Sequence, residues 1–492
     1  MNLRLTWVQP EDLVGHELRL AGEDGRDARA IAGRWYAAGG PPAPETAGAS
    51  AAPRPDLRPL AEELLDTLAS LPTPSSHHEP TSLPSIQALT TPLTTSPRDP
   101  AGTDGEAPRL HPREAPGPRG VGGGDPGLVR VSGRGGVGES DALLHRLHAA
   151  WLGRAVGCLL GKPVEKLPLP AIRALARAAG NWPLSTWFTA RGVPPELLAA
   201  HPWNRRSATT SLAENIDGMP EDDDLNYPLL NLLLLQRYGR DFTTADVARL
   251  WLDELPAGRT FTAERVAYRN LLDGVEPPLT AVRRNPFREW IGAQIRADVH
   301  GWTHPGDPVA AAAQAYRDAA LTHTTNGVYG AMFVAATLAA AATGTADVHR
   351  SLAAGLTVIP PRSRLAEAVR LGIDSARAHD DFDTVVDRLH AGLGGYHWVH
   401  AVPNAALLAA ALTHGDGDFS RSVCAAVSGG WDTDSNGATA GSVAGLLAGH
   451  PDRLPERWTT PLKNRLATSV PSFDGIGFDT LAELTHLEAV RP

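Results

Sequence analysis

Long alanine- and leucine-rich segments with helical spacing constrain the fold of this chain more than any other feature. Alanine is the strongest helix former, and the period-2 alternation typical of strands is scarce in the C-terminal two thirds. The segments are residues 143–161, 225–239, 309–323, 330–344, 364–379, 404–415 and 438–450. The sequence therefore predicts one all-α domain over residues 140–492, whose first helix begins near Ser140 as N-cap.

Glycines recur every fourth residue in two of these segments. They are Gly153, Gly157 and Gly161 in the first, and Gly437, Gly441, Gly445 and Gly449 in the last. Glycine costs helix stability, so a regular stripe favours two helix backbones in close approach. A general bias of composition is the alternative explanation.

The N-terminal 139 residues have a different composition. Residues 3–8 (LRLTWV) alternate apolar and polar side chains, which predicts a strand, whereas residues 28–39 and 57–71 have helical spacing. Residues 73–139 are rich in Pro, Ser, Thr and Gly and cannot bury enough apolar surface to fold. We therefore expect a small α+β module over residues 1–72, tethered by a disordered linker, and a C-terminal domain that folds without it.

Charge and cysteine content limit the function classes. The formal net charge is -10, which argues against a general nucleic-acid surface, and no segment has the apolar length of a membrane span. Only two cysteines occur and no signal-peptide core precedes the first helix. We expect a cytoplasmic monomer with no membrane or nucleic-acid partner.

Four consecutive acids, from Glu221 to Asp224, directly precede the leucine-rich helix at 225–239. Acids at a helix start are ordinary, because the free N–H groups favour negative charge, so a solvated cap is one interpretation. The leucine content predicts a helix buried nearly all round, however. Adjacent carboxylates at the mouth of a buried helix repel one another unless a cation neutralises them, and a divalent cation with oxygen ligands is the natural partner.

A second acidic motif, WDTDSNG, starts the last glycine-rich segment. Asp432 and Asp434 are two residues apart and cannot share one helix face, so they lie in a loop or at a helix entrance where Ser435 can join them. An isolated Asp-x-Asp is often a turn. Paired with the first acidic cluster, it becomes a candidate for a two-metal site.

Four motifs, GCLLGKPVE, PEDDDLNYPLL, THTTNGVYGAMF and GGWDTDSNGATAGSVAG, resemble, in this order, the ADP-ribosylglycohydrolase family. The resemblance covers roughly residues 140–470 and is most specific in DTDSNGATAG. It implies a compact all-α fold of orthogonal helices with a binuclear magnesium or manganese centre. It also implies hydrolysis of the N- or O-glycosidic bond at C1″ of an ADP-ribosyl group, with the metals holding the ribose hydroxyls.

The resemblance also assigns metal ligands. The family's Thr-Asp-Asp motif falls on Asp222, Asp223 and Asp224, so an aspartate replaces the usual threonine; a register in which Glu221 takes that place remains open. The later Asp-x-Asp-Thr motif falls on Asp432, Asp434 and Ser435. The extra aspartate adds negative charge and leaves the preferred metal and substrate undecided.

The remaining site residues are two candidate bases and a set of substrate contacts. Glu165 matches a family glutamate that activates water, although a surface acid is the alternative, and Asp298 lies where some members have an acid. Lys162 stands where the family often has aspartate. Substrate contacts are expected from His323, Asn326, Gly327, Tyr396, His400 and Asn436. Backbone N–H groups at the glycine-containing helix start could bind the pyrophosphate, and aromatic rings could stack on adenine.

Three functions remain open at this point. The first is a metal-dependent glycohydrolase acting on an ADP-ribosylated protein, a small ADP-ribosyl compound or another ribosyl N-glycoside. The second is a catalytically silent ADP-ribose-binding or structural protein, against which the retained acids argue. The third is a two-metal phosphoesterase, which would release inorganic phosphate.

Overall fold

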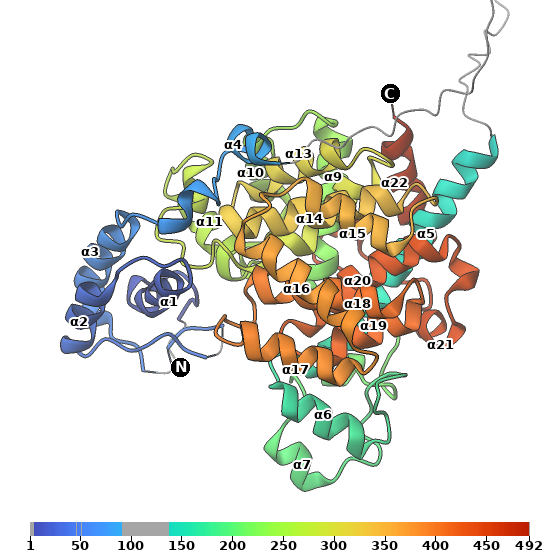
Figure 1. Ribbon diagram of the computed structural model, residues 1–492, viewed down its shortest axis with the longest axis horizontal. Helices are drawn as coiled ribbons and strands as arrows, with labels where there is room; N and C mark the ends of the chain where they lie inside the picture. The colour runs from blue at the N-terminus through green and yellow to red at the C-terminus, as the bar shows by residue number, and fades with distance from the viewer. Residues whose placement is uncertain (1–3, 46, 51, 91–136, 492) are drawn as a thin grey trace, which may run out of the picture.

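The chain folds into helices, as a computed structural model describes for residues 4–45, 47–50, 52–90 and 137–491 (Figure 1). In these ranges there is no β-strand, and β pairing is limited to two isolated bridges, Met219–Leu466 and Trp290–His400. The prediction of an all-α C-terminal region is therefore confirmed. No helix in the described part of the chain has the length and hydropathy needed to cross a bilayer.

The N-terminal region contains four α-helices: α1 (Pro10–Glu23), α2 (Arg29–Ala37), α3 (Arg58–Ala69) and α4 (Leu83–Leu89). The C-terminal region contains the others: α5 (Val137–Gly161), α6 (Leu169–Ala178), α7 (Pro195–Ala200), α8 (Ala208–Ser211), α9 (Asp223–Tyr238), α10 (Thr244–Glu254), α11 (Thr262–Leu272), α12 (Asp298–Trp302), α13 (Pro308–Ala319), α14 (Thr325–Ala341), α15 (Val348–Thr357), α16 (Arg364–Ala378), α17 (Phe382–Leu393), α18 (Ala401–Gly415), α19 (Phe419–Ser428), α20 (Thr433–Ala448), α21 (Glu456–Thr459) and α22 (Phe478–Val490).

Helices α5 and α20 pack against each other in opposite directions, with their glycine stripes face to face. A Cβ added at Gly157 would lie 1.8 Å from the carbonyl oxygen of Gly437, and one at Gly153 would lie 2.1 Å from that of Gly441. Atoms cannot approach so closely, so only glycine fits. The stripe therefore reflects backbone contact rather than composition, and it brings the C-terminal end of α5 to the start of α20.

The Gly157→Ala variant is expected to lose about 1–3 kcal/mol of unfolding free energy, because the added methyl group must push two helix backbones apart. Gly33→Ala in α2 is the matched control, since nothing lies within 4 Å of a Cβ at that glycine. The control should be neutral or slightly stabilising. Denaturant titration of both purified variants measures the difference, and equal stability of Gly157→Ala and the wild type would contradict this packing.

The α+β expectation for the N-terminal module is wrong, because its described part is helical. The described part of the segment predicted as a strand, residues 4–8, has no partner strand in the described ranges and contacts α11 instead. There the Arg265 guanidinium donates to Thr6 Oγ1 at 3.1 Å and stacks 4.8 Å from the centre of the Trp7 ring. Alternation of apolar and polar residues favours a strand only where another strand can pair with it. The two helices predicted in this module are present as α2 and α3.

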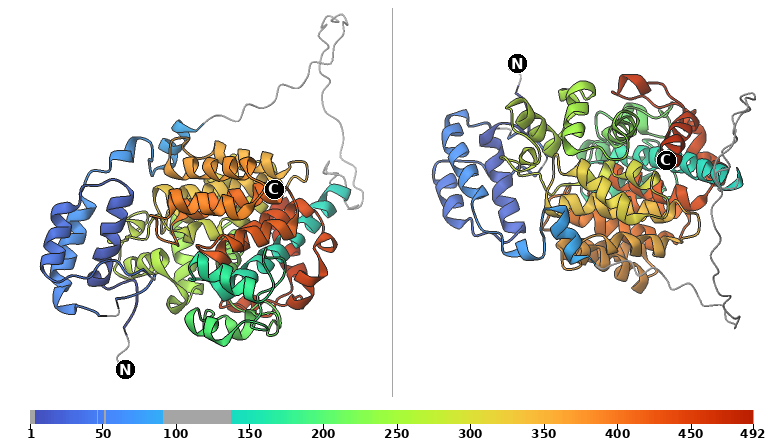
Figure 2. Two further views of the ribbon diagram at one scale, coloured as in Figure 1. Left: turned by 60° about the horizontal axis from the view of Figure 1, so that its bottom comes forward. Right: turned by 90° about the horizontal axis from the view of Figure 1, so that it is seen from above.

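The N-terminal residues pack on the C-terminal region rather than standing apart from it (Figure 2). Ion pairs join Glu17 to Arg288 at 2.9 Å, Glu79 to Arg364 at 2.8 Å and Asp66 to Arg284 at 2.8 Å. Part of the predicted linker is also ordered, because residues 74–77 form a 3-10 helix and residues 83–89 form α4. The segment 91–136, also expected to be linker, lies outside the described residues.

Candidate metal centre

The first acidic turn caps helix α9. Asp222 is the N-cap residue, and its Oδ1 accepts the Asp224 backbone N–H at 2.9 Å. Asp224 is buried, and Asp223 between them is only partly buried. Asp222 therefore caps the helix but is buried rather than solvated, and the leucines of that helix are buried, as the sequence predicted.

The second acidic turn begins helix α20. Asp432 is its N-cap residue, and its backbone N–H donates to Asn404 Oδ1 at 3.1 Å. Gly430 and Trp431 before it both have positive φ, which bends the chain sharply into the helix. Asp434 accepts the Ser435 backbone N–H at 3.1 Å, so both aspartates face the entrance of α20.

The end of α5 joins the two turns. The carbonyl of Gly161, the last residue of α5, accepts a hydrogen bond from the Thr433 hydroxyl at 2.9 Å. Lys162, which follows Gly161 in the chain, donates through its ammonium to Asp222 Oδ2. Gly161 therefore contacts the start of α20, and Lys162 contacts the start of α9. The acids near residues 222 and 432 meet in space, as expected from the sequence; we call Asp222, Asp223, Asp224, Asp432, Asp434 and Glu165 the acidic site.

Arg154 holds the buried side of this site. Its guanidinium donates to the Asp224 carbonyl at 2.7 Å and to Asp298 Oδ2 at 2.9 Å, and the residue is fully buried. Asp298 is fully buried as well. This placement argues against Asp298 as the base that activates water, because its carboxylate anchors Arg154 and has no contact with solvent.

Electrostatic repulsion dominates the acidic site. Burial, followed by neighbouring carboxylates, raises the pKa of Asp223, Asp224 and Asp432 well above the usual range. Burial, then Glu165 and Asp222, raises the pKa of Asp434 to about 7. These shifts mean that the site holds too little positive charge for its carboxylates to ionise freely.

The donor set fits a hard divalent cation. One carboxylate oxygen each from Asp222 and Asp224 lies within 4.8 Å of the other and of Cys158 Sγ. Asp224 Oδ1 is buried and accepts no hydrogen bond from the described residues. Asp222, Asp432, Asp434 and Ser435 keep 6–9% of their surface exposed, so an ion can reach them. Oxygen donors and excess negative charge are what Mg²⁺ and Mn²⁺ require.

Glu165 lies at the rim of the acidic site, just after α5. Its Oε2 accepts the Asn204 side-chain amide at 2.6 Å, and its Oε1 pairs with the Lys166 ammonium at 2.8 Å. The side chain is 19% exposed, unlike the fully buried Asp298. These two contacts orient the carboxylate and leave lone pairs on both oxygens for a water proton.

Of the predicted substrate contacts, Asn436 adjoins the acidic site. Its side-chain amide donates at 2.7 Å to Asn404 Oδ1, the same atom that accepts the Asp432 N–H. Asn436 is fully buried, so it positions the α20 entrance rather than meeting solvent. Asn404, which sequence reasoning left without a role, links α18 to that entrance.

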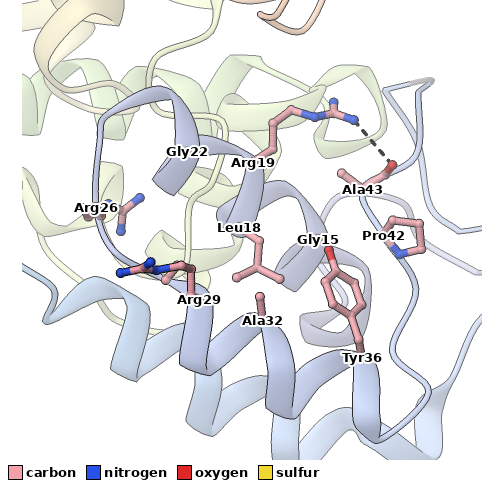
Figure 3. Close-up of a pocket in the computed structure, with 11 residues that line it drawn as sticks. Gly15, Leu18, Arg19, Gly22, Arg26, Arg29, Ala32, Tyr36, Pro42 and Ala43 are labelled. Atoms are coloured by element: carbon pink, nitrogen blue, oxygen red, sulfur yellow. Dashed lines mark hydrogen bonds between the residues drawn. The ribbon is translucent and has the colours of Figure 1, made fainter.

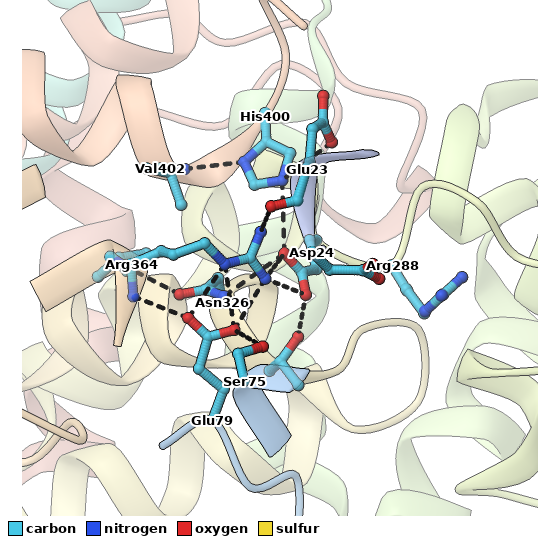
Figure 4. A network of polar contacts seen from close by, with 12 residues as sticks. Glu23, Asp24, Ser75, Glu79, Arg288, Asn326, Arg364, His400 and Val402 are labelled. Atoms are coloured by element: carbon cyan, nitrogen blue, oxygen red, sulfur yellow. Dashed lines mark hydrogen bonds and ion pairs between the residues drawn. The ribbon is translucent and has the colours of Figure 1, made fainter. Parts of the chain in front are cut away.

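The other predicted substrate contacts lie elsewhere. His323 is 1% exposed beside Thr322, and a Cβ at Gly327 would lie 2.5 Å from the Arg288 carbonyl oxygen, so this helix start packs on protein. Asn326 and His400 are fully buried around Glu289 and the Arg364 guanidinium (Figure 4). Tyr396 packs on His400 with ring centres 4.7 Å apart. In this arrangement these residues contact protein rather than an open pyrophosphate site.

A pocket of about 430 Å³ lies between α1 and α2, and all its lining residues fall between Gly15 and Ala43 (Figure 3). Arg19, Arg26, Arg29 and Tyr36 contribute side chains to it. Arg19 donates to the Ala43 carbonyl at 3.4 Å, and Arg26 is held by Asp24. None of the lining residues belongs to the acidic site.

Three functional neighbours of the acidic site share one stripe of α5 and its end. Arg154, Cys158 and Lys162 are four residues apart, each directly after a glycine of the stripe. Residues four apart lie on one helix face, so the glycine contact with α20 sets where all three point. The sequence signal was available: Arg154 and Lys162 each directly follow a glycine of the stripe, in and just after the apolar second half of α5.

Sequence comparison gives the class of protein. A sequence model described as ADP-ribosylglycohydrolase matches residues 139–490. The chain belongs to the ADP-ribosylglycohydrolase family, which confirms the resemblance drawn from the four motifs. The comparison with curated proteins gave no match. A solved structure described as an ADP-ribosylglycohydrolase-related protein complex is 20% identical, with a TM-score of 0.43; the match covers 71% of this chain and 99% of that one.

Proposed function

We propose that residues 140–492 form the catalytic domain of a metal-dependent hydrolase that cleaves the glycosidic bond at C1″ of ADP-ribosyl groups. The observation that supports this most is the meeting of two remote acidic turns, at the starts of α9 and α20, around carboxylates that lack sufficient positive charge. Buried carboxylates with no structural counter-ion are costly, and such clusters mark functional sites.

In this proposal Asp222, Asp223, Asp224, Asp432, Asp434 and Ser435 are the candidate ligands of Mg²⁺ or Mn²⁺. A bound divalent cation would offset the carboxylate charge and bind the hydroxyls of the distal ribose. The short loops at α9 and α20 fix these side chains through backbone hydrogen bonds, such as the one from Asp224 N–H to Asp222.

Glu165 is the candidate base. In the proposed step its carboxylate accepts a proton from the water that attacks C1″, while the bond to the acceptor breaks through an oxocarbenium-like state; the acceptor leaves with the bonding electron pair and takes up a proton from Glu165 or from solvent. Asn204 and Lys166 hold the carboxylate in place during this transfer.

The substrate is an ADP-ribosylated protein or a small ADP-ribosyl or ribosyl compound. An acidic overall charge and a buried acidic site favour a substrate that presents hydroxyl groups to a cation over one that needs a basic surface. We propose that the protein acts as a cytoplasmic monomer, without a nucleic-acid or membrane partner.

Mass spectrometry of product release tests this function. The purified chain is incubated with peptides carrying ADP-ribose on arginine, serine or glutamine, with ADP-ribosylated nucleic-acid ends, and with nucleosides, each with and without Mg²⁺ or Mn²⁺. We expect release of a free ribose end that depends on metal, and a loss of about 10²–10⁴-fold in kcat for Glu165→Gln with metal binding retained.

The controls separate the remaining functions. Release of inorganic phosphate in place of a free ribose end would identify a phosphoesterase and overturn the proposal. Metal binding with no turnover of any of these substrates would favour a silent binding protein. A full rate for Glu165→Gln would remove Glu165 from the reaction but leave the metal-dependent activity in place.

A further inference from the structure

Lys162 points into the acidic site as a charge supplied by the protein itself. We propose that its ammonium occupies one of the cation positions, so that the site takes one divalent ion per chain rather than two. This inference rests on the proposed function, because it assigns the cations of the same site.

The Lys162 side chain is held firmly where it is. It is 9% exposed, its ammonium bonds to Asp222 Oδ2, and it also donates to the Glu221 carbonyl at 3.3 Å. The preceding residue, Gly161, is fixed by Thr433 and could not carry a Cβ, which would lie 2.3 Å from the Thr433 carbonyl oxygen. A side chain anchored at both its backbone and its charged end cannot swing out easily to admit an ion.

Protein cations are shared unevenly among the acids of this site. Asp222 contacts Lys162, and Asp224 lies 3.5 Å from the buried Arg154 guanidinium. Among the described residues, no ion pair reaches Asp223, Asp432 or Asp434. Lys162 therefore neutralises Asp222 directly and favours the charged forms of Asp223 and Asp434 only from farther away, which leaves negative charge for a metal ion.

Charge repulsion disfavours a divalent ion at Asp222. A divalent ion bound to Asp222 would compete for the oxygen that Lys162 already occupies and would sit beside a buried ammonium. Like charges at such a distance repel strongly where little water screens them. Asp223, Asp432 and Asp434 form no ion pair of their own among the described residues, so their oxygens are the candidate ligands of the single ion.

An ammonium and a metal ion bind a diol differently. The Lys162 ammonium offers only N–H donors, from the position where Asp222 holds it, whereas a divalent ion binds several oxygen ligands at once from different directions. The Asp222–Lys162 pair would therefore hold one hydroxyl of the sugar by a directional hydrogen bond. The extra aspartate at position 222, where threonine is usual, then serves to hold the lysine.

The stoichiometry of Mn²⁺ binding tests this inference without any activity measurement. The full chain, stripped of metal, is titrated with Mn²⁺ by calorimetry, and bound Mn²⁺ is examined by electron paramagnetic resonance. We expect one ion per chain and the six-line spectrum of an isolated Mn²⁺. Two ions per wild-type chain, or a spectrum of two coupled ions, would overturn the inference and leave the proposed function standing.

Two variants sharpen the experiment. Lys162→Met removes the charge at similar volume and is expected to raise the stoichiometry to two ions per chain. Lys463→Met, which changes an exposed lysine paired with Asp217, should keep one ion. If Lys162→Met does not fold, the wild-type stoichiometry decides alone. A wild-type chain that binds no Mn²⁺ at all would overturn both this inference and the proposed function.

Discussion

The Asp434→Asn variant is expected to lose turnover by more than about 100-fold, because it removes a candidate carboxylate ligand that forms no ion pair with any described residue. Even residues that only orient a metal ligand change affinity or activity by about 10–100-fold when they are mutated. The product-release experiment with an ADP-ribosylated peptide measures the rate, and metal titration measures the affinity.

The melting temperature of Asp434→Asn distinguishes the loss of a metal ligand from the unfolding of the variant. Burial and neighbouring acids raise the pKa of Asp434 to about 7, so near and above neutral pH its ionised form costs folding free energy in metal-free protein. An uncharged amide removes that cost. Without metal at pH 8, Asp434→Asn should therefore melt at or above the wild-type temperature, while Mn²⁺ should stabilise only the wild type.

The matched control is Asp253→Asn, which changes an exposed aspartate on α10. It should keep the rate, the metal affinity and the melting temperature of the wild type. Full activity of Asp434→Asn toward every substrate that the wild type cleaves would show that the α20 entrance does not carry the chemistry.

The second large effect concerns the N-terminal residues. A chain that begins at residue 137 is expected to aggregate, or to melt at least about 10 °C lower than the full chain. Deletion moves buried apolar side chains into water, which costs about 1.5–3 kcal/mol for each large one, and a loss of 1 kcal/mol lowers the melting temperature of a domain by about 2–4 °C. Size-exclusion chromatography and thermal melts of the two chains measure both outcomes.

The physical reason is the interface that deletion exposes. Arg288 would lose Glu17, and Arg364 would lose Glu79, all of them mostly buried. The indole of Trp290, stacked 4.3 Å from the His397 ring and covered by His16, would also meet water. This exposure reverses the expectation, drawn from the linker-like composition, that the C-terminal domain is indifferent to what precedes it.

A chain in which residues 91–136 are replaced by Gly and Ser at the same length is the control. It keeps every N-terminal contact described above and should melt like the wild type. A chain starting at residue 137 that stays monomeric with an unchanged melting temperature would show that the N-terminal contacts contribute nothing to stability.

Helical periodicity predicted the C-terminal fold because the signal is local. Leu229, Leu232 and Leu233 are spaced so that a helix buries them, whatever the neighbours are. The glycine stripe carried long-range information as well, since glycines at Gly153 and Gly437 favour a backbone contact wherever their helices meet. The LRLTWV segment shows the limit: a strand requires a partner, and no local pattern reveals that the partner is missing.

The acidic site was predictable in part. The runs at Asp222 and Asp432 stand out as closely spaced acids next to apolar helical segments, and the structure brings their helix starts together through Gly161 and Lys162. The substrate contacts were less predictable, because burial depends on what covers a residue. The motifs predicted Asn326 and His400 as ligand contacts, but both contact Glu289, which pairs with Arg364, and Glu79 of the N-terminal region pairs with the same guanidinium. Whether such a residue can contact a ligand depends on tertiary packing, which the local sequence does not show.

Crystals of the full chain soaked in Mn²⁺ show most directly whether the acidic site binds a divalent ion, through the anomalous difference map at the manganese edge. We expect a peak between the starts of α9 and α20, within bonding distance of carboxylate oxygens from Asp223 and from Asp432 or Asp434. A map without a peak there, at Mn²⁺ concentrations that saturate binding in solution, would show that these two helix starts do not form the metal site.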